Sequence, residues 1–334
     1  MKNYKKIGLG LVCILLSCSL SAQVKKVEAI GMTVKDMNRS VKFYSEVLGF
    51  KKISDQEFSG PEYEKLENIF GLHIRVVRLK LGDEMIELTD YLTSGGRMIP
   101  EEAKANDLSF QHIAIVVSDM GKAYAQLRKY NVEHVSTSPQ TLPATIAPAA
   151  GVKAFYFHDP DNHNLELIYF PNGKGQPKWH KNANGKIFLG IDHTAIGVSN
   201  TDSSLLFYQT VLGVERKGES FNYGMEQEHL NNVEGASLHI TGLRSPLGPG
   251  IEFLQYLKPG VGKPYPPDTK AEDIWYWQTT LVVEDVERLY NQLKSEGYQF
   301  VSKGMVEFET KNGKKLKEFI VRDRDGHAML LKGE

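Results

Sequence analysis

The chain has 334 residues, of which 41% are hydrophobic and 24% charged, a balance typical of soluble globular proteins. Its 40 basic and 41 acidic side chains give a net charge of −1, which excludes the strongly basic surface of a nucleic-acid-binding protein and indicates no membrane-surface partner. The length exceeds that of one ordinary compact domain, so two domains are expected.

The first 22 residues have the pattern of a secretory signal peptide. Three lysines precede an apolar run over residues 7–20, which ends close to the small residue Ala22. The run is too short for a comfortable transmembrane helix. We therefore expect cleavage after Ala22 and a periplasmic or secreted protein without a transmembrane segment. The alternative is a lipoprotein anchored at Cys18, because residues 15–18 resemble a lipobox.

An internal repeat organises the rest of the chain. Residues 43–49 read FYSEVLG and residues 207–213 read FYQTVLG, and a strand-like run precedes each motif. Two further copies begin with similar strands at residues 112–117 and 278–283. Each copy continues with an amphipathic helix and then with short strand-like runs separated by turn signals. The sequence therefore predicts an α+β fold built from four βαβββ modules.

A linker divides these modules into two pairs. The segment over residues 173–189 is rich in glycine, proline, lysine and asparagine, a composition typical of a connection between domains. The prediction is a first domain over residues 24–172 and a second domain over residues 190–332, with two modules in each.

The alternation of side chains along the first strand of each module predicts a hollow face. In the strand over residues 29–34 the large apolar side chains share the face that packs on the helix, and small side chains share the other face. The strand over residues 112–117 repeats this pattern, with His112 at the start of its small-residue face. Small residues leave space that suits a ligand pocket, although large side chains from neighbouring strands could fill it.

The last strand of the first two modules adds a carboxylate to the hollow face. By the same alternation, Glu87 and Glu166 point away from the helices. Burying carboxylates in an apolar pocket is unfavourable, and a divalent cation held by carboxylates and imidazole offsets that penalty. We therefore expect one divalent metal ion at Glu87, His112 and Glu166. These residue types do not distinguish zinc, nickel, cobalt, manganese and iron.

Three further side chains are candidates for contact with a small-molecule substrate. Arg78 lies across a predicted hairpin turn from Glu87, where it either binds a substrate carboxylate or pairs with Glu87. Tyr156 and His158 fall on the inner side of their strand near Glu166, although His158 is alternatively a solvated residue at the rim.

Several short motifs resemble those of the vicinal-oxygen-chelate superfamily. They are VKD at 34–36, FY at 43–44, LGF at 48–50, IELT at 86–89, HIAI at 112–115, DPD at 159–161 and LEL at 165–167. This superfamily includes glyoxalases, epimerases, bleomycin resistance proteins and extradiol dioxygenases. The resemblance covers nearly everything after the first 22 residues. It implies four modules arranged as two paired domains of the glyoxalase-like fold.

In metal-dependent members, the resemblance implies ligands from the first and last strands of two paired modules. In the first pair of this chain those positions are Ala29, Glu87, His112 and Glu166. In the second pair they are His193, Glu252, Gln278 and Leu330. Alanine and leucine cannot bind a metal ion. The resemblance therefore implies one site at Glu87, His112 and Glu166, and a second, weaker site at His193, Glu252 and Gln278.

The activity that the resemblance implies is proton transfer next to a carbonyl group. A divalent-metal-dependent isomerase, epimerase or lyase would act on a small metabolite, with Glu166 or Glu87 as the catalytic base. Two alternatives stay open, a metal-free small-molecule-binding protein and a metal-dependent, extradiol-like dioxygenase. Extradiol dioxygenases use two histidines and one carboxylate, and neither assumed pair supplies both histidines. The oligomeric state is not determined.

Overall fold

The computed structural model describes residues 24–181, 183–309 and 312–333. The predicted signal peptide over residues 1–22 and the alternative anchor Cys18 lie outside the described residues, so export stays a prediction. Among the described residues, no helix is both long enough and apolar enough to cross a membrane.

The first two βαβββ modules lie where the repeat predicts them. The first contains β1 (Val24–Thr33), α1 (Met37–Lys42), the π-helical turn η1 (Phe43–Val47), β2 (Lys51–Ser59), α2 (Pro61–Glu67), β3 (His73–Leu81) and β4 (Glu84–Tyr91). The second contains β5 (Phe110–Val117), α3 (Met120–Lys129), β6 (Gln140–Thr141), η2 (Ala147–Ala149), β7 (Lys153–His158) and β8 (Asn164–Tyr169). The short helix η3 (Pro177–His180) follows within the predicted linker.

The third and fourth modules repeat this plan. The third contains β9 (Phe188–Gly197), α4 (Thr201–Leu205), η4 (Leu206–Val211), β10 (Glu215–Tyr223), α5 (Met225–Asn231), β11 (Ser237–Arg244) and β12 (Gly250–Lys258). The fourth contains β13 (Trp277–Val283), α6 (Val286–Ser295), β14 (Val306–Glu309), β15 (Lys315–Arg322) and β16 (Ala328–Gly333).

A side-chain cap begins the helix after the first strand of every module. The Asp36 carboxylate accepts a hydrogen bond of 3.0 Å from the backbone N–H of Arg39. The same contact begins the other three helices at Asp119, Asn200 and Asp285. After α1 and η1 the chain turns at Gly49, whose φ of +75° favours glycine. Local sequence is therefore sufficient to start and end these helices.

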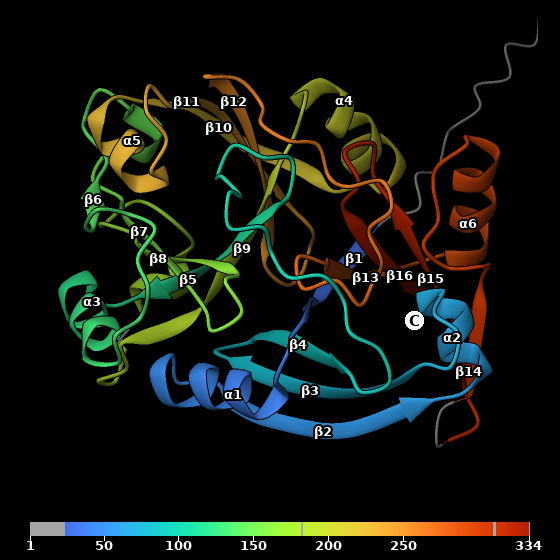
Figure 1. Cartoon of the computed structure of the whole chain (residues 1–334). Helices are drawn as coiled ribbons and strands as arrows, with labels where there is room; N and C mark the ends of the chain where they lie inside the picture. Colours follow the sequence, from blue (N-terminus) through green and yellow to red (C-terminus); the bar gives the residue numbers. More distant parts are fainter. Residues whose placement is uncertain (1–23, 182, 310–311, 334) are drawn as a thin grey trace, which may run out of the picture.

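The four modules form two eight-stranded sheets, and the modules of sheet A are not consecutive (Figure 1). Sheet A joins the first module to the fourth in the order β14-β15-β16-β13-β1-β4-β3-β2. Sheet B joins the second module to the third in the order β10-β11-β12-β9-β5-β8-β7-β6. The α+β fold of four paired modules is confirmed. This strand pairing corrects the prediction that the first module shares a site with the second. The domain boundary at 173–189 stays a prediction.

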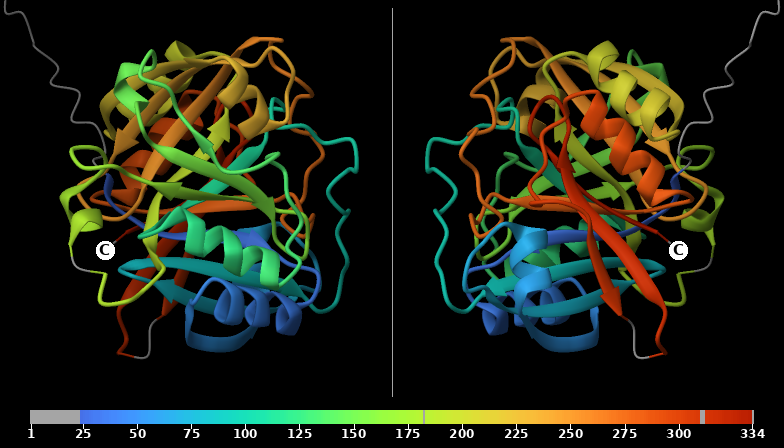
Figure 2. Two further views of the ribbon diagram at one scale, coloured as in Figure 1. Left: turned by 90° about the vertical axis from the view of Figure 1, so that its left-hand side faces the viewer. Right: turned by 90° about the vertical axis from the view of Figure 1, so that its right-hand side faces the viewer.

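The long connections between modules hold the two sheets together. The connection over residues 92–109 runs beside the one over residues 259–276 (Figure 2). Backbone hydrogen bonds join them, including Leu108 N–H to Lys263 O at 2.8 Å and Gly262 N–H to Asn106 O at 2.7 Å. The fourth module is thereby brought back against the first.

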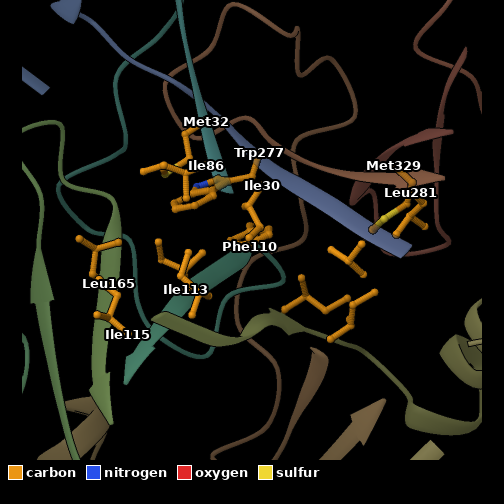
Figure 3. Packing of buried hydrophobic residues seen from close by; sticks show 14 of the residues in the cluster. Ile30, Met32, Ile86, Phe110, Ile113, Ile115, Leu165, Trp277, Leu281 and Met329 are labelled. Carbon is orange, nitrogen blue, oxygen red and sulfur yellow. The ribbon is translucent and has the colours of Figure 1, made fainter. Parts of the chain in front are cut away.

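One hydrophobic core, which contains residues of all four modules, lies between the two sheets. At its centre the indole ring of Trp277 on β13 stacks on the ring of Phe110 on β5, with centroids 4.2 Å apart and planes at 3° (Figure 3). Trp277 is 3% exposed. It packs beside Ile30 of β1, so a single side chain connects sheet A to sheet B.

Candidate metal centre

A cavity of about 290 Å³ opens on sheet B between the second and third modules. We call it the sheet B cleft. Its lining includes Tyr156, Glu166, His193, Asn222, Gln227 and Glu252. The predicted face thus contains a cavity, although large side chains such as Leu142 and Trp179 pack over Ala114 and fill part of it.

The pairing of β5 with β9 brings four candidate ligands together around two alanines. Ala114 on β5 lies between His193 on one neighbouring strand and Glu166 on the other. Ala195 on β9 lies in the same way between His112 and Glu252. Because both alanines have small side chains, the four larger side chains converge above them.

The ligand atoms of this set are close to one another. His112 Nε2 lies 3.2 Å from Glu166 Oε2. His193 Nε2 lies 3.6 Å from the same oxygen and 3.4 Å from Glu252 Oε2. Bonds of ~2.0–2.2 Å from nitrogen and oxygen ligands to one ion require neighbouring donor atoms to be ~3.0–3.5 Å apart. The ligand atoms of His112, Glu166 and His193 all lie within 4.8 Å of one another, which suits a shared divalent cation, and Glu252 lies beside this group at His193.

The two imidazoles also lack partners for the nitrogens that face one another. Among the described residues, neither His112 Nε2 nor His193 Nε2 has a hydrogen-bond partner, and both atoms are buried. A buried nitrogen without a partner is unfavourable in a folded protein. Two such nitrogens beside two carboxylates fit a divalent metal ion, which takes neutral imidazole and carboxylate oxygen together.

The opposite ring nitrogens are held by the residues that precede each histidine. His112 Nδ1 donates to Gln111 Oε1 at 2.6 Å, and His193 Nδ1 donates to Asp192 Oδ2 at 3.1 Å. Neighbouring residues of a regular strand point to opposite faces, but the β5–β9 ladder skips Gln111 and Asp192 in its register. These β-bulges turn both partners toward the histidines. The tautomer that leaves Nε2 free is thereby fixed.

Asp192 connects the site to the predicted linker. Its carboxylate accepts a hydrogen bond of 2.6 Å from Trp179 Nε1 and an ion pair from Arg244. Burial raises the pKa of Asp192, but the hydrogen bond with His193 and the charge of Arg244 outweigh it, so the pKa lies well below its usual range. The aspartate therefore stays ionised. The 173–189 segment, through η3, supports the centre rather than only joining two domains.

No hydrogen bond joins His193 Nε2 to Glu252 Oε2, 3.4 Å away, but the two groups shift each other's pKa. Burial lowers the pKa of His193, but the charge of Glu252 and the hydrogen bond with Asp192 raise it well above its usual value. Burial raises the pKa of Glu252, yet the charge of His193 brings it below its usual value. Glu252 is consequently ionised at neutral pH.

The structure does not bring together the three ligands predicted from the sequence. His112 and Glu166 share the sheet B cleft, whereas Glu87 lies on β4 of sheet A, in a separate cavity with Arg78 and Gln278. Arg78 Nε donates to Glu87 Oε2 at 2.6 Å, the second of its two predicted roles. Glu87 is remote from the centre because the first module pairs with the fourth.

The predicted second, weaker site is divided in the same way. His193 and Glu252 belong to the sheet B cleft, and Gln278 belongs to sheet A. Ala29, Glu87, Gln278 and Leu330 occupy in sheet A the places that His112, Glu166, His193 and Glu252 occupy in sheet B. Among the described residues, the candidate ligands His112, Glu166 and His193 thus gather on sheet B with Glu252 beside them, rather than as two sets of three.

Of the predicted substrate contacts, Tyr156 reaches the centre and His158 does not. Tyr156 pairs with Glu166 across β7 and β8, and its ring centroid lies 4.8 Å from that of His112. Burial raises the pKa of Tyr156 well above its usual value, so the phenol stays protonated. His158, at the end of β7, lies 4.0 Å from the Glu133 carboxylate and lines a different cavity beside Trp277.

Sequence reasoning missed Gln111 and Asp192. A signal for them is present, because each of the two histidines that become ligands follows a side chain able to accept from its Nδ1. Regular alternation assigned both partners to the opposite face, and only the bulges overturn that assignment.

Asp192→Asn is expected to weaken the binding of a divalent metal ion by ~10–100-fold, the usual effect of losing an outer-shell carboxylate partner of a histidine ligand. The amide removes the charge that fixes His193. Competition against a chromophoric chelator measures the change. Glu87→Gln, a carboxylate in the other sheet, serves as the control and should retain wild-type affinity. Equal affinities for Asp192→Asn and the wild type would contradict the positioning role.

Residues 26–167 and 190–331 each match the Glyoxalase/Bleomycin resistance protein/Dioxygenase superfamily. The chain is 29% identical over 201 residues to glyoxalase I of Saccharomyces cerevisiae, a match that covers 55% of each chain. It is 30% identical over 151 residues to a 2-epi-5-epi-valiolone epimerase of Actinomyces sp, covering 44% of this chain and 80% of that protein. The chain therefore spans about half the length of the yeast relative.

Among solved structures, a variant of glyoxalase I from Zea mays is similar over nearly its whole length. The two share a TM-score of 0.60 at 15% sequence identity, with 92% of this chain and 93% of the other covered. At that identity the similarity shows the fold alone. The two family matches together span most of the sequence and contain all four converging ligands. The chain therefore belongs to the Glyoxalase/Bleomycin resistance protein/Dioxygenase superfamily.

Proposed function

We propose that the protein is a divalent-metal-dependent enzyme that transfers a proton at the carbon next to a carbonyl group. The single observation that carries the proposal is the convergence of His112, Glu166, His193 and Glu252, with two buried imidazole nitrogens left without partners. Relatives named glyoxalase I and an epimerase support an isomerase, epimerase or lyase over other reaction classes.

A divalent cation at this place would polarise a substrate carbonyl and so acidify the neighbouring C–H bond. The residues of the chain supply the base. Glu252 is the better candidate, because 24% of its side chain is exposed in the cleft against 6% for Glu166. Glu252 is also ionised, so a carboxylate oxygen is available to take the proton. Glu166 stays a second candidate, and Glu87 cannot act here because it lies in sheet A.

The lining of the sheet B cleft favours a neutral, hydroxylated substrate. Among the described lining residues the one cationic side chain apart from histidine, Lys174, already donates to the carbonyls of Ala147 and Pro148. The amides of Asn222 and Gln227 line the opposite wall, and Asn222 Oδ1 is buried without a partner. An amide oxygen of this kind accepts a hydrogen bond from a substrate hydroxyl group. A small hydroxy-ketone or sugar derivative suits these groups better than a carboxylate.

One observation favours a second candidate function, an extradiol-like dioxygenase. The sequence-based objection was that neither assumed pair of modules supplied two histidines. The pairing of the second module with the third removes this objection, since His112 and His193 share the site with a carboxylate. A second one stays, because residues 142–155 before Tyr156 contain no histidine that could act as the catalytic base of such an enzyme. Two histidines and one carboxylate are the ligand set of many non-haem iron oxygenases. The additional carboxylate of Glu252, which lies beside this group, argues for proton transfer.

Exchange of substrate hydrogen with solvent tests the proposal. Metal-loaded protein is incubated in D₂O with neutral hydroxy-ketones such as dihydroxyacetone and hydroxyacetone, and deuterium at the carbon next to the carbonyl is followed by NMR. We expect exchange that requires the metal ion and falls ~10²–10⁴-fold in Glu252→Gln, the usual contribution of a general base. Oxygen uptake with catechols and no exchange would indicate the dioxygenase. Failure to bind any divalent metal after reconstitution would leave only a metal-free binding protein.

A further inference from the structure

A second cavity, of about 430 Å³, lies on sheet A at the place that corresponds to the sheet B cleft. We call it the sheet A cleft. Its lining includes Phe58, Tyr63, Glu67, Arg78, Glu87 and Glu318. The fold has therefore retained a hollow between the first and fourth modules, although the ligand positions there have changed.

The sheet A cleft is unsuited to the metal ion that the sheet B cleft fits. Two of its four ligand positions carry Ala29 and Leu330, which have no donor atoms. The carboxylate of Glu87 is neutralised by Arg78 at 2.6 Å. The amide of Gln278 accepts a hydrogen bond of 3.1 Å from the Tyr276 hydroxyl group. A ligand of this cavity must be recognised by other chemistry.

Carboxyl groups outnumber cations around this cleft. Arg78 forms an ion pair with Glu87, and Lys332 forms an ion pair with Glu28. Glu28 lies at a β-bulge, because the β1–β13 ladder skips it in its register. These pairs use both cationic side chains of the described lining. Three carboxyl groups of the lining remain in excess, the exposed Glu309 and the more buried Glu67 and Glu318. The surplus favours a cationic ligand.

The pKa values of Glu67 and Glu318 agree with a surplus of carboxyl groups around the cleft. Burial raises the pKa of Glu67 to about 8, with a further contribution from the charge of Glu87. Burial also raises the pKa of Glu318; Lys332 opposes this, but the charges of Glu87 and Glu28 add to it. At Glu318 burial and the neighbouring carboxylates outweigh the nearby cations, and a bound cation would stabilise the ionised form of both groups.

Three aromatic rings form one wall of the same cleft. The centroids of Phe58 and Tyr63 are 5.0 Å apart, and those of Tyr63 and Phe308 are 4.8 Å apart. The rings come from β2, α2 and β14, so both modules contribute to the wall. Aromatic faces attract organic cations, and they suit an ammonium group with hydrocarbon substituents better than a strongly hydrated ion.

We propose that the sheet A cleft is a metal-independent binding site for a small organic ammonium ion. The aromatic wall of Phe58, Tyr63 and Phe308 contacts the hydrocarbon groups, and Glu318 and Glu309 supply the negative charge. The site is separate from the proposed metal centre, since the two clefts lie on different sheets. It does not depend on the proposed reaction.

Isothermal titration of the full chain with choline, tetramethylammonium and benzylamine tests this site. The decisive comparison is choline against 3,3-dimethylbutan-1-ol, which has the same shape without the charge. We expect one binding site per chain for at least one of the three cations, and binding of the neutral analogue at least ~10-fold weaker, within the range of cation–π attraction. Absence of binding for all three cations, or equal binding of choline and its neutral analogue, would overturn the proposal.

Matched variants locate the binding. Glu318→Gln should weaken the binding of the cation at least ~10-fold, a change that one lost charge contact readily produces. Glu252→Gln, the same substitution in the sheet B cleft, should leave it unchanged. A reversed or equal pattern would place the cation elsewhere and refute the assignment. If Glu318→Gln changes the far-UV circular dichroism spectrum, Phe308→Leu replaces it as the test variant. This substitution in the partly buried aromatic wall should also weaken the binding of the cation.

Discussion

Reconstituted protein is expected to hold one divalent metal ion per chain, and Glu166→Ala and His193→Ala are each expected to abolish stoichiometric binding. Each substitution removes a donor from a set whose atoms are 3.2–3.6 Å apart. It also leaves the remaining buried groups without compensation. The loss should exceed the ~10–100-fold effect of an outer-shell change. Elemental analysis after gel filtration measures the bound metal.

Glu87→Ala is the matched control, because Glu87 occupies in sheet A the position that Glu166 occupies in sheet B. This variant should bind one equivalent of metal as the wild type does. A thermal scan gives an independent measurement, since an ion present at a hundred times its Kd stabilises the fold by ~2.7 kcal/mol. The stabilisation should persist in Glu87→Ala and vanish in Glu166→Ala. Loss of metal from Glu87→Ala alone would restore the site predicted from consecutive modules.

Trp277→Ala is expected to reduce the free energy of unfolding by ~3–5 kcal/mol, as large-to-small substitutions of buried aromatic residues do. The indole ring fills the space between β13 and β5, stacked on Phe110 at 4.2 Å and in edge contact with His163 at 5.0 Å. Removing it leaves a cavity at the junction of the two sheets. Urea unfolding followed by circular dichroism measures the change.

Trp275→Ala provides the comparison for Trp277. Trp275 is only partly buried, in the connection before β13, with Arg97 over its ring at 4.7 Å and its Nε1 donating to Thr269 at 3.0 Å. Its removal should cost distinctly less stability, because a partly exposed site loses less buried contact. A loss below about 1 kcal/mol for Trp277→Ala, or a larger loss for Trp275→Ala, would show that the sheets are not joined through the core residue.

Much of the molecule follows from local rules that the sequence alone contains. The capping side chains Asp36 and Asp119 begin their helices as their position after a strand indicates. The two-residue period of a strand correctly placed His112 and Glu166 on the hollow face. The resemblance to the superfamily named His193 and Glu252 as further candidates, so all four residues of the centre were identified individually.

The sequence did not determine which of these candidates meet. Each module presents a similar first strand, and the hydrogen bonds along its edge are made by backbone groups common to every residue. The choice of partner therefore depends on long-range contacts, such as the stack of Trp277 on Phe110 and the paired connections 92–109 and 259–276. Grouping consecutive modules placed Glu87 in the site and left Glu252 out.

The bulges that complete the centre were equally invisible in the sequence. A strict period of two assigns Gln111 and Asp192 to the face opposite their histidines, and one skipped residue in the ladder reverses that assignment. Such a register shift is settled by the pairing of two strands distant in sequence. The sequence by itself thus determined the modules and individual candidate ligands on the face opposite the helices. Only the tertiary structure decided which modules share a sheet, because that choice rests on backbone pairing and on packing between segments far apart in the chain.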